Sequence, residues 1–291
     1  MSSMSFNCSV CGGILGRELL VITQPDRFER HAGVSERGYR RVWVECPECG
    51  TATDILPPGP NRLADIEKAY YAVDFQNSSI PEKFKKIMSL PGGHSDNAIR
   101  VDRILDFLDN WQPLSCTNLR RALDIGSGLG VFPARFLDRC GGGWSMTAVE
   151  PDPMAAAHLA SLNRFEVAHD GFPMRENPGQ FHLVTLNKVV EHIGSPVEYL
   201  RAVAMVLDPA SGVAYIEVPD KATIHARPSS DNILGALHRH LYDLKGLLRL
   251  LTEAGLVAMR LERILEPSGK LSVFAFATLP VVAARLSAVR P

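Results

Sequence analysis

The stretch "RALDIGSGLGVF", Arg121 to Phe132, joins an apolar run that ends in an acid to a turn with glycines at alternate positions, Gly126, Gly128 and Gly130. Because glycine has no Cβ, the chain can turn sharply there and a ligand can approach the backbone. In open α/β sheets, such turns lie at the carboxyl ends of strands, where ligands bind. A glycine turn alone can also simply tighten a strand–helix junction. The stretch therefore predicts a nucleotide-type site without identifying the nucleotide.

A second acid narrows the choice of ligand. The next apolar run ends in "AVEP", which places Glu150 26 residues after Asp124. A carboxylate at this position can accept hydrogen bonds from both ribose hydroxyls. The glycine spacing, D-x-G-x-G-x-G, differs from the G-x-G-x-x-G arrangement that holds a pyrophosphate. Together these features favour an adenosine-type ligand that carries no phosphates.

The region around these motifs alternates strand and helix patterns. Seven strands are predicted, at 119–125, 144–150, 164–169, 181–187, 212–219, 256–265 and 270–278. Crossover helices through the first five predict a mostly parallel, doubly wound α/β sheet. The last two strands are separated only by "EPSG", a hairpin-length link, so we expect the final strand to run antiparallel to its neighbour.

Several segments in this order resemble the class I S-adenosylmethionine-dependent methyltransferases: "LDIGSGLG", "AVEPD", "FHLVTLNKVVEHI", "GVAYIEVP" and "LLRLLTEAGL". The resemblance covers about 119–278 and implies a Rossmann-like sheet with strand order 3-2-1-4-5-7-6. It also implies that residues after successive strands hold the cofactor: Asp124, Gly126, Ser127, Gly128 and Gly130 the methionine part, Glu150 with its neighbour Pro151 the ribose, Asp170 the adenine, and Asn187 and Lys188 beside the sulfonium.

Four cysteines near the start form a CxxC-x34-CxxC pattern: Cys8, Cys11, Cys46 and Cys49. Four thiolates can close a tetrahedron about Zn²⁺ and leave no open position, so the pattern predicts a structural zinc site. Four unligated thiols are an alternative. A redox pair is less favoured, because neither CxxC opens a helix in a βαβ pattern.

These patterns divide the chain into three parts. Residues 1–58 are predicted to form a zinc-ribbon module that ends at "LPPGP", and 59–118 a helical linker that caps the substrate. Residues 119–291 are predicted to form the S-adenosylmethionine-binding methyltransferase domain. Within the linker, "NRLADIEKAYYAV" and "SDNAIRVDRILDFLDNW" have helical patterns.

The order of these parts is similar to that of bacterial methyltransferases of nucleotide-sugar and surface-polysaccharide biosynthesis, including the sugar C-methyltransferases. In "LHRHLYDLKGLLRLL", His240 falls where that family has its catalytic histidine and Tyr242 follows it, but Arg239 replaces the family's glutamate. The resemblance implies His240 and Tyr242 as catalytic residues and a nucleotide sugar as acceptor. His192 in "VVEHI" is a third catalytic candidate, beside the expected cofactor.

Composition limits the other functions. The 291 residues carry 31 basic and 32 acidic side chains, so the formal charge is −1 and no overall field attracts nucleic acid or an anionic membrane. The sequence shows neither a membrane-length apolar run nor a secretory signal, and with its CxxC pairs this predicts a cytoplasmic protein. Two alternatives stay open: an RNA base methyltransferase with a zinc ribbon, and a non-catalytic protein that kept the cofactor fold. The segment "LNKV", which replaces an "NPPY"-type tetrapeptide, argues against the first.

Overall fold

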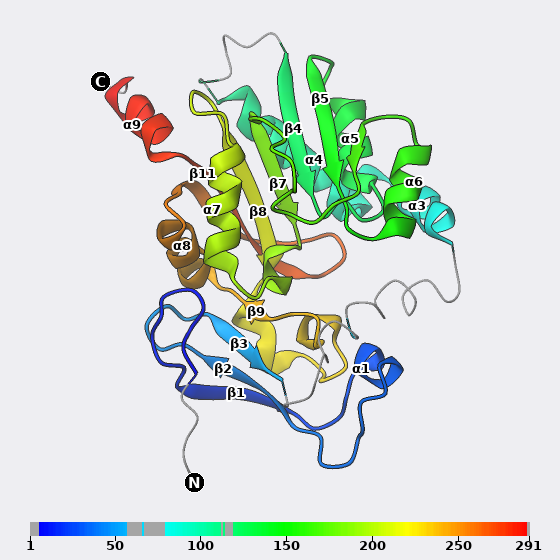
Figure 1. Cartoon of the computed structure of the whole chain (residues 1–291), viewed down its shortest axis with the longest axis vertical. Helices are drawn as coiled ribbons and strands as arrows, with labels where there is room; N and C mark the ends of the chain where they lie inside the picture. The colour runs from blue at the N-terminus through cyan, green and yellow to red at the C-terminus, as the bar shows by residue number, and fades with distance from the viewer. Residues whose placement is uncertain (1–5, 57–65, 67–78, 112, 114–118, 290–291) are drawn as a thin grey trace.

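The computed structural model describes residues 6–56, 66, 79–111, 113 and 119–289. Within these residues the chain forms a large mixed sheet covered by helices and a small sheet near the N-terminus (Figure 1). The predicted helix "NRLADIEKAYYAV" lies outside the described residues except for Ile66. The second predicted linker helix is confirmed as α4 (Asp96–Asp109), which follows α3 (Ile80–Met88) and the short turn η1 (Gly92–His94).

The large sheet has the order β10-β11-β8-β7-β4-β5-β6 in the described part of the chain. Its strands are β4 (Arg120–Ile125), β5 (Trp144–Val149), β6 (Glu166–Ala168), β7 (Leu183–Asn187), β8 (Val213–Pro219), β10 (Val257–Leu265) and β11 (Leu271–Thr278). The first five pair in parallel, whereas β11 is antiparallel to both β8 and β10. Counted within this sheet, the order is the predicted 3-2-1-4-5-7-6, which confirms the expectation.

Helices cover both faces of this sheet, because successive side chains of each strand point to opposite faces. Leu123 and Ile125 pack toward α7 (Pro196–Val206) and α8 (Leu244–Glu253). Ala122 belongs to the core on the other face, which is formed with α4, α5 (Val131–Arg139) and α9 (Pro280–Val289). α6 (Pro153–Ser161) lies beside β6. Because every second residue of a strand points to the same face, the two cores keep the sheet between two helical layers (Figure 1).

Two helices that pack on this sheet, α4 and α8, begin at capping side chains. The hydroxyl of Ser95 accepts a hydrogen bond from the N–H of Ala98 at 3.3 Å at the start of α4. Asp243 accepts from the N–H of Gly246 at 2.8 Å at the start of α8. Such caps satisfy amides that have no partner within the helix. They therefore fix where each helix leaves the sheet, and with it the loops that build the site.

The small sheet draws on two distant parts of the chain. Its order is β1-β2-β3-β9 within the described residues, with β1 (Arg17–Ile22), β2 (Arg41–Glu45) and β3 (Ala52–Ile55) from the N-terminal module and β9 (His240–Leu241) from the segment after β8. Ala52 pairs with Leu241 and Thr53 with His240. The predicted module 1–58 therefore completes its sheet with a strand from outside its boundary, which the sequence did not predict.

A buried charged group also fastens the two parts together. Arg41 is fully buried, forms an ion pair with Asp54, and donates a hydrogen bond to the carbonyl oxygen of Leu234 at 2.7 Å. The segment from β8 to β9 that contains Leu234 also includes the short turns η4 (Lys221–Ala226) and η5 (Asn232–Leu234). Apolar side chains of both parts, including Trp43 and Ile233, share one core. The N-terminal module, with α1 (Arg27–His31) at its edge, thus packs on the β8–β9 segment (Figure 1).

Candidate functional site: two adjoining cavities

The glycine turn lies between β4 and α5, and its three glycines do not all have the same surroundings. All three have positive φ, 72° at Gly126, 53° at Gly128 and 76° at Gly130. A Cβ at Gly126 would lie 2.7 Å from Cγ2 of Val189, and one at Gly130 would lie 2.5 Å from Cδ2 of Leu159. A Cβ at Gly128 would meet nothing within 4 Å. Gly126 and Gly130 therefore allow close packing, whereas Gly128 faces open space.

Asp124 and Glu150 are both buried and hold the loop. Asp124 accepts hydrogen bonds from Oγ1 of Thr185 at 2.6 Å and Nδ2 of Asn187 at 3.1 Å, and burial raises its pKa to about 6. The carboxylate of Glu150 accepts from the backbone N–H of Gly128 at 2.8 Å. These bonds join three successive strand ends into one rigid edge. The hydroxyl of Ser127 donates to the carbonyl oxygen of Asp124 at 2.9 Å.

A cavity of about 270 Å³ opens at this edge of the sheet. Its wall includes five of the predicted cofactor residues: Asp124, Gly126, Ser127, Asn187 and Lys188. Buried Arg100 from α4 also lines it and forms an ion pair with Glu217. The charged side chains of the wall balance: Arg100, Lys188 and Lys270 against Asp96, Asp124 and Glu266. A wall with both signs of charge suits a zwitterionic ligand such as an amino acid.

The other predicted cofactor residues lie outside the wall of this cavity. Gly128, Gly130 and Glu150 support the loop as described above, and the carbonyl oxygen of Pro151 lies 3.2 Å from Nε2 of His169. Asp170 accepts hydrogen bonds from the N–H groups of Gly171 at 2.9 Å and Arg175 at 2.8 Å. The carboxylate of Asp170 therefore organises its own loop, and its contact with adenine stays a prediction.

A second cavity, of about 720 Å³, adjoins the first. Lys188 and Lys270 line both cavities. The larger one is walled by α1 of the N-terminal module, the turn η3 (Val190–His192), the segment 227–238 and the hairpin between β10 and β11. Lys188 has a positive φ of 61°, which is unusual for a residue with a side chain. Its ammonium group lies 2.9 Å from Oε1 of Glu266 and 3.2 Å from Oε1 of Glu217, so these acids hold it at the junction.

The structure separates the three predicted catalytic residues. His192 lines the larger cavity. His240 is 2% exposed; its Nε2 lies 3.2 Å from Oγ of Ser9 and its Nδ1 3.4 Å from Oγ1 of Thr53, both in the N-terminal module. Tyr242 is fully buried, and neither Tyr242 nor His240 is among the residues that line the two cavities. Their catalytic roles stay predictions, but only His192 has direct access to a ligand space.

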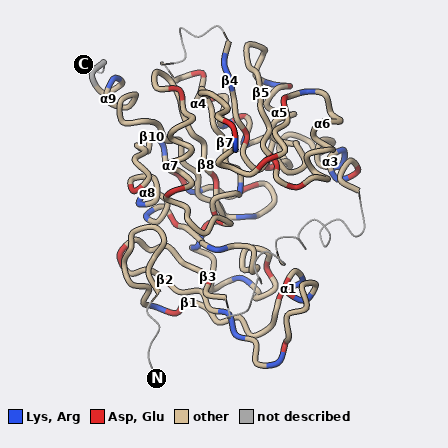
Figure 2. Tube along the Cα trace, viewed as in Figure 1, with Lys and Arg blue, Asp and Glu red and all other residues tan. Residues whose placement is uncertain are grey.

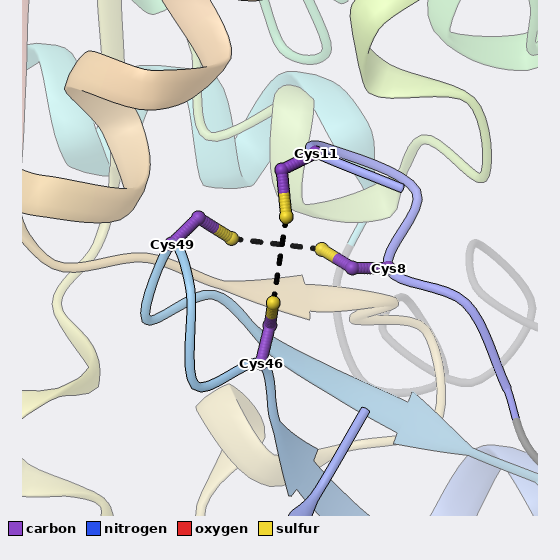
Figure 3. Close-up of side chains that lie close together, drawn as sticks. All are labelled: Cys8, Cys11, Cys46 and Cys49. Carbon is purple, nitrogen blue, oxygen red and sulfur yellow. Dashed lines mark hydrogen bonds between the residues drawn. The ribbon is translucent and has the colours of Figure 1, made fainter. Parts of the chain in front are cut away.

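The four predicted zinc ligands converge (Figure 3). Their sulfur atoms lie within 4.8 Å of one another, with Cys8 and Cys49 at 3.6 Å and Cys11 and Cys46 at 3.4 Å. Zn–S bonds of about 2.3 Å in a tetrahedron place sulfurs about 3.8 Å apart, so the cluster has the size that zinc needs. The glycine after each CxxC has a positive φ and donates its N–H to the first cysteine's carbonyl oxygen: Gly12 to Cys8 at 2.9 Å and Gly50 to Cys46 at 2.8 Å.

Other side chains of the two cavities were not predicted from the sequence. Glu191 and His238 lie beside His192 in the larger cavity, and Arg100 lines the smaller one. Glu191 was visible next to His192 in "VEH". His238 and Arg100 carry no local signal, because long-range packing brings them to the site.

Two further features of the described residues bear on binding partners. Within this part of the chain, no helix has both the length and the apolar character needed to cross a bilayer. Basic and acidic side chains are interspersed over both parts of the molecule (Figure 2).

Comparison with known proteins identifies the family. The family model described as "Methyltransferase domain" matches residues 96–261, more than half of the chain. The ubiquinone biosynthesis O-methyltransferase of Ralstonia nicotianae is 27% identical over 158 residues, which cover 52% of this chain and 63% of that protein. That of Pseudomonas aeruginosa is 30% identical over 140 residues, covering 45% and 59%. The chain thus matches less than two thirds of the length of these relatives.

Solved structures share the fold. The Burkholderia thailandensis 1,6-didemethyltoxoflavin-N1-methyltransferase, solved with S-adenosylhomocysteine, is 18% identical with a TM-score of 0.51, over 82% of this chain and 96% of that one. Coclaurine N-methyltransferase is 12% identical with a TM-score of 0.52, over 72% and 82%. At these identities the likeness concerns the fold alone. The family match shows that the chain belongs to the methyltransferase-domain family, and these solved structures share its fold.

Proposed function

We propose that this protein transfers a methyl group from S-adenosylmethionine to a small molecule bound in the larger cavity. The observation that carries the proposal is the junction of the two cavities at Lys188 and Lys270. A methyl donor in the smaller cavity and an acceptor in the larger one would meet there. Methyl transfer depends mainly on alignment of the two reactants, and adjoining cavities in a rigid sheet edge supply it.

The residues of the smaller cavity fit the methionine end of the cofactor. The acids Asp124 and Asp96 can face its ammonium group, and buried Arg100 can face its carboxylate. Glu150, held by the N–H of Gly128, is assigned to the ribose and Asp170 to the adenine, as the sequence predicts. S-adenosylmethionine, when bound, supplies a methyl group that is already electrophilic, so the protein needs no covalent intermediate.

The acceptor side must orient the nucleophile and, for an acceptor hydroxyl, receive its proton. His192 and His238 both line the larger cavity. In the proposed function the His192–His238 pair handles the acceptor proton, and His240 with Tyr242 supports the wall from behind. The role of His240 thereby changes from base to positioning residue, because its ring nitrogens face Ser9 and Thr53.

The acceptor is proposed as a small molecule that is methylated on oxygen or nitrogen. The names of the relatives support this chemistry, since they are O- and N-methyltransferases. The nucleotide sugar predicted from the sequence is a narrower proposal. What supports it is the volume of about 720 Å³ and the basic side chains Arg27, Arg227 and Lys270 in the wall, which suit a phosphate.

The cysteine cluster is proposed to hold structural zinc. Four cysteine ligands fill the coordination sphere of the ion, so the site adds stability rather than chemistry. Lys221 lies against it and ties the second CxxC to the methyltransferase region, with its Nζ 2.7 Å from Oε1 of Glu45 and 3.0 Å from Oδ2 of Asp243. Zinc at this position would keep β2 and β3 in place, and with them the module whose α1 forms part of the acceptor wall.

An assay with methyl-labelled S-adenosylmethionine tests the proposed function. Small-molecule acceptors, including nucleotide sugars, phenols and amines, are incubated with the protein and products are detected by mass spectrometry. We expect label in at least one acceptor, with turnover abolished by Asp124→Ala. Label in tRNA but in no small molecule would contradict the proposal and favour the RNA methyltransferase.

A further inference from the structure

Three metal-ligating side chains converge in the wall of the larger cavity, apart from the cysteine cluster. Glu191, His192 and His238 each offer one ligand atom, and these atoms lie within 4.8 Å of one another. The two imidazole rings have centroids 4.7 Å apart. Glu191 and His192 belong to η3, whereas His238 lies just before β9, so the fold brings the group together from two segments.

The two histidines are oriented by backbone carbonyl groups. Nδ1 of His192 lies 2.9 Å from the carbonyl oxygen of Leu237, and Nδ1 of His238 lies 2.8 Å from that of Ile233. A carbonyl oxygen can only accept, so the proton of each neutral ring lies on Nδ1 and the lone pair on Nε2. Metal-binding histidines are oriented by the same type of hydrogen bond.

Glu191 differs from the two histidines, because its buried carboxylate has no hydrogen-bond partner among the described residues. Its side chain is fully buried, and neither oxygen accepts a hydrogen bond from the described residues. The nearby cation Lys188 pairs with Glu217 and Glu266 instead. A buried polar group without a partner is destabilising, and coordination to an ion is one way in which proteins satisfy such a group.

We infer that Glu191, His192 and His238 bind a divalent metal ion at the wall of the acceptor cavity. One carboxylate oxygen and two imidazole nitrogens suit Mn²⁺, Fe²⁺ or Zn²⁺. Ligand atoms about 2.1 Å from an ion lie about 3 Å or more from one another, which is compatible with atoms that all lie within 4.8 Å. Three protein ligands leave positions for an acceptor oxygen, unlike the closed cysteine cluster.

The consequence for chemistry rests on the proposed function, although metal binding itself does not. An acceptor hydroxyl bound at this position would have its pKa lowered, as metal-bound water does. With their Nε2 atoms on the ion, His192 and His238 would serve as ligands rather than as the base, and the acceptor proton would pass to solvent water. The oxygen–methyl bond would form as the sulfur–methyl bond of S-adenosylmethionine breaks, and S-adenosylhomocysteine would leave. The substrate class that fits is a hydroxyl-bearing small molecule, with its oxygen on the ion and its ring or chain in the larger cavity.

Titration with Mn²⁺ tests the site. Mn²⁺ prefers oxygen and nitrogen ligands over thiolates, so the zinc-loaded cysteine cluster does not compete. The full chain is titrated without cofactor, and free Mn²⁺ is measured by electron paramagnetic resonance. We expect one Mn²⁺ per chain with a dissociation constant below about 100 μM, weakened at least tenfold by Glu191→Gln and by His238→Gln. The matched controls are Glu198→Gln and His225→Gln, whose exposed side chains lie outside the group.

Two outcomes would overturn the inference: wild-type protein that binds no Mn²⁺ at about 1 mM, or affinity that stays within twofold in both Glu191→Gln and His238→Gln. Variant folding is checked by binding of S-adenosylhomocysteine. If a variant fails this check, Mn²⁺ is added to the wild type, and selective broadening of the His192 and His238 ring signals in NMR decides the question. Absence of that broadening would also overturn the inference. Methyl transfer without added metal would leave the proposed function standing.

Discussion

The smaller cavity and the larger cavity are built from different kinds of contact. The loop Asp124 to Gly130 and Glu150 belong to one strand–helix–strand unit, and their hydrogen bonds join neighbouring strand ends. The wall of the larger cavity combines α1, η3, the segment 227–238 and the hairpin after β10. A substitution that disrupts the N-terminal module should therefore lower acceptor turnover without lowering the affinity for the cofactor. Both cavities adjoin the same edge of the large sheet, so a substitution that disrupts this edge should abolish cofactor binding and acceptor turnover together.

The largest effect is expected in the glycine turn. Gly126→Ala places a Cβ 2.7 Å from Val189 at a φ of 72°, so the loop must move and strained backbone adds about 1 kcal/mol or more. We expect the affinity for S-adenosylhomocysteine to fall at least 100-fold, and turnover with it. The matched control is Gly142→Ala, which also has a positive φ but open space around its Cβ. Equal affinity in the two variants would remove the turn from the cofactor site.

The second prediction concerns His192, a side chain that lines the larger cavity but not the smaller one. His192→Gln removes an imidazole from the wall of the larger cavity. Loss of this group, as a general base or as a metal ligand, should lower turnover by about 100-fold. Cofactor affinity should change less than threefold, because His192 does not line the smaller cavity. Rates come from labelled methyl transfer and affinity from calorimetry. Unchanged turnover would place the acceptor elsewhere.

The third effect concerns zinc. Replacing Cys46 and Cys49 together by serine should remove zinc and loosen β2 and β3, and acceptor turnover should fall about tenfold or more. Because the cofactor loop belongs to the large sheet, affinity for S-adenosylhomocysteine should stay within threefold. Cys140→Ser, at a cysteine outside the cluster, serves as the control, and metal analysis gives the zinc content. Loss of cofactor binding together with zinc would show that the two regions fold as one unit.

The smallest effect is expected at His240. His240→Gln keeps a polar side chain between Ser9 and Thr53 and disturbs two hydrogen bonds, each worth about 1 kcal/mol. Turnover should therefore fall less than fivefold, while the free energy of unfolding in urea drops by about 1 to 2 kcal/mol. A 100-fold loss of turnover in a stably folded variant would restore His240 as the base.

The sequence predicted the large sheet well because its determinants are local. Strand patterns, the helical pattern of "SDNAIRVDRILDFLDNW" and the "EPSG" link lie within short segments, and the antiparallel ending follows from them. The strand order came from the resemblance to the methyltransferase family. The glycine turn and Glu150 were found for the same reason.

The acceptor wall could not be predicted in this way. β9 has only two residues, too few for any periodicity, and its pairing with β3 spans most of the chain. His238 and His240 are two residues apart, yet one lines the cavity and the other faces the N-terminal module. That difference arises because the strand begins only at His240, so loop packing orients His238.

The most direct test of the account is a calorimetric titration of the wild-type protein with S-adenosylhomocysteine. We predict binding of one molecule per chain, and weakening of at least tenfold in Glu150→Ala, which loses the carboxylate that holds Gly128. A titration that shows no binding at millimolar concentration, with the protein folded and loaded with zinc, would contradict the account.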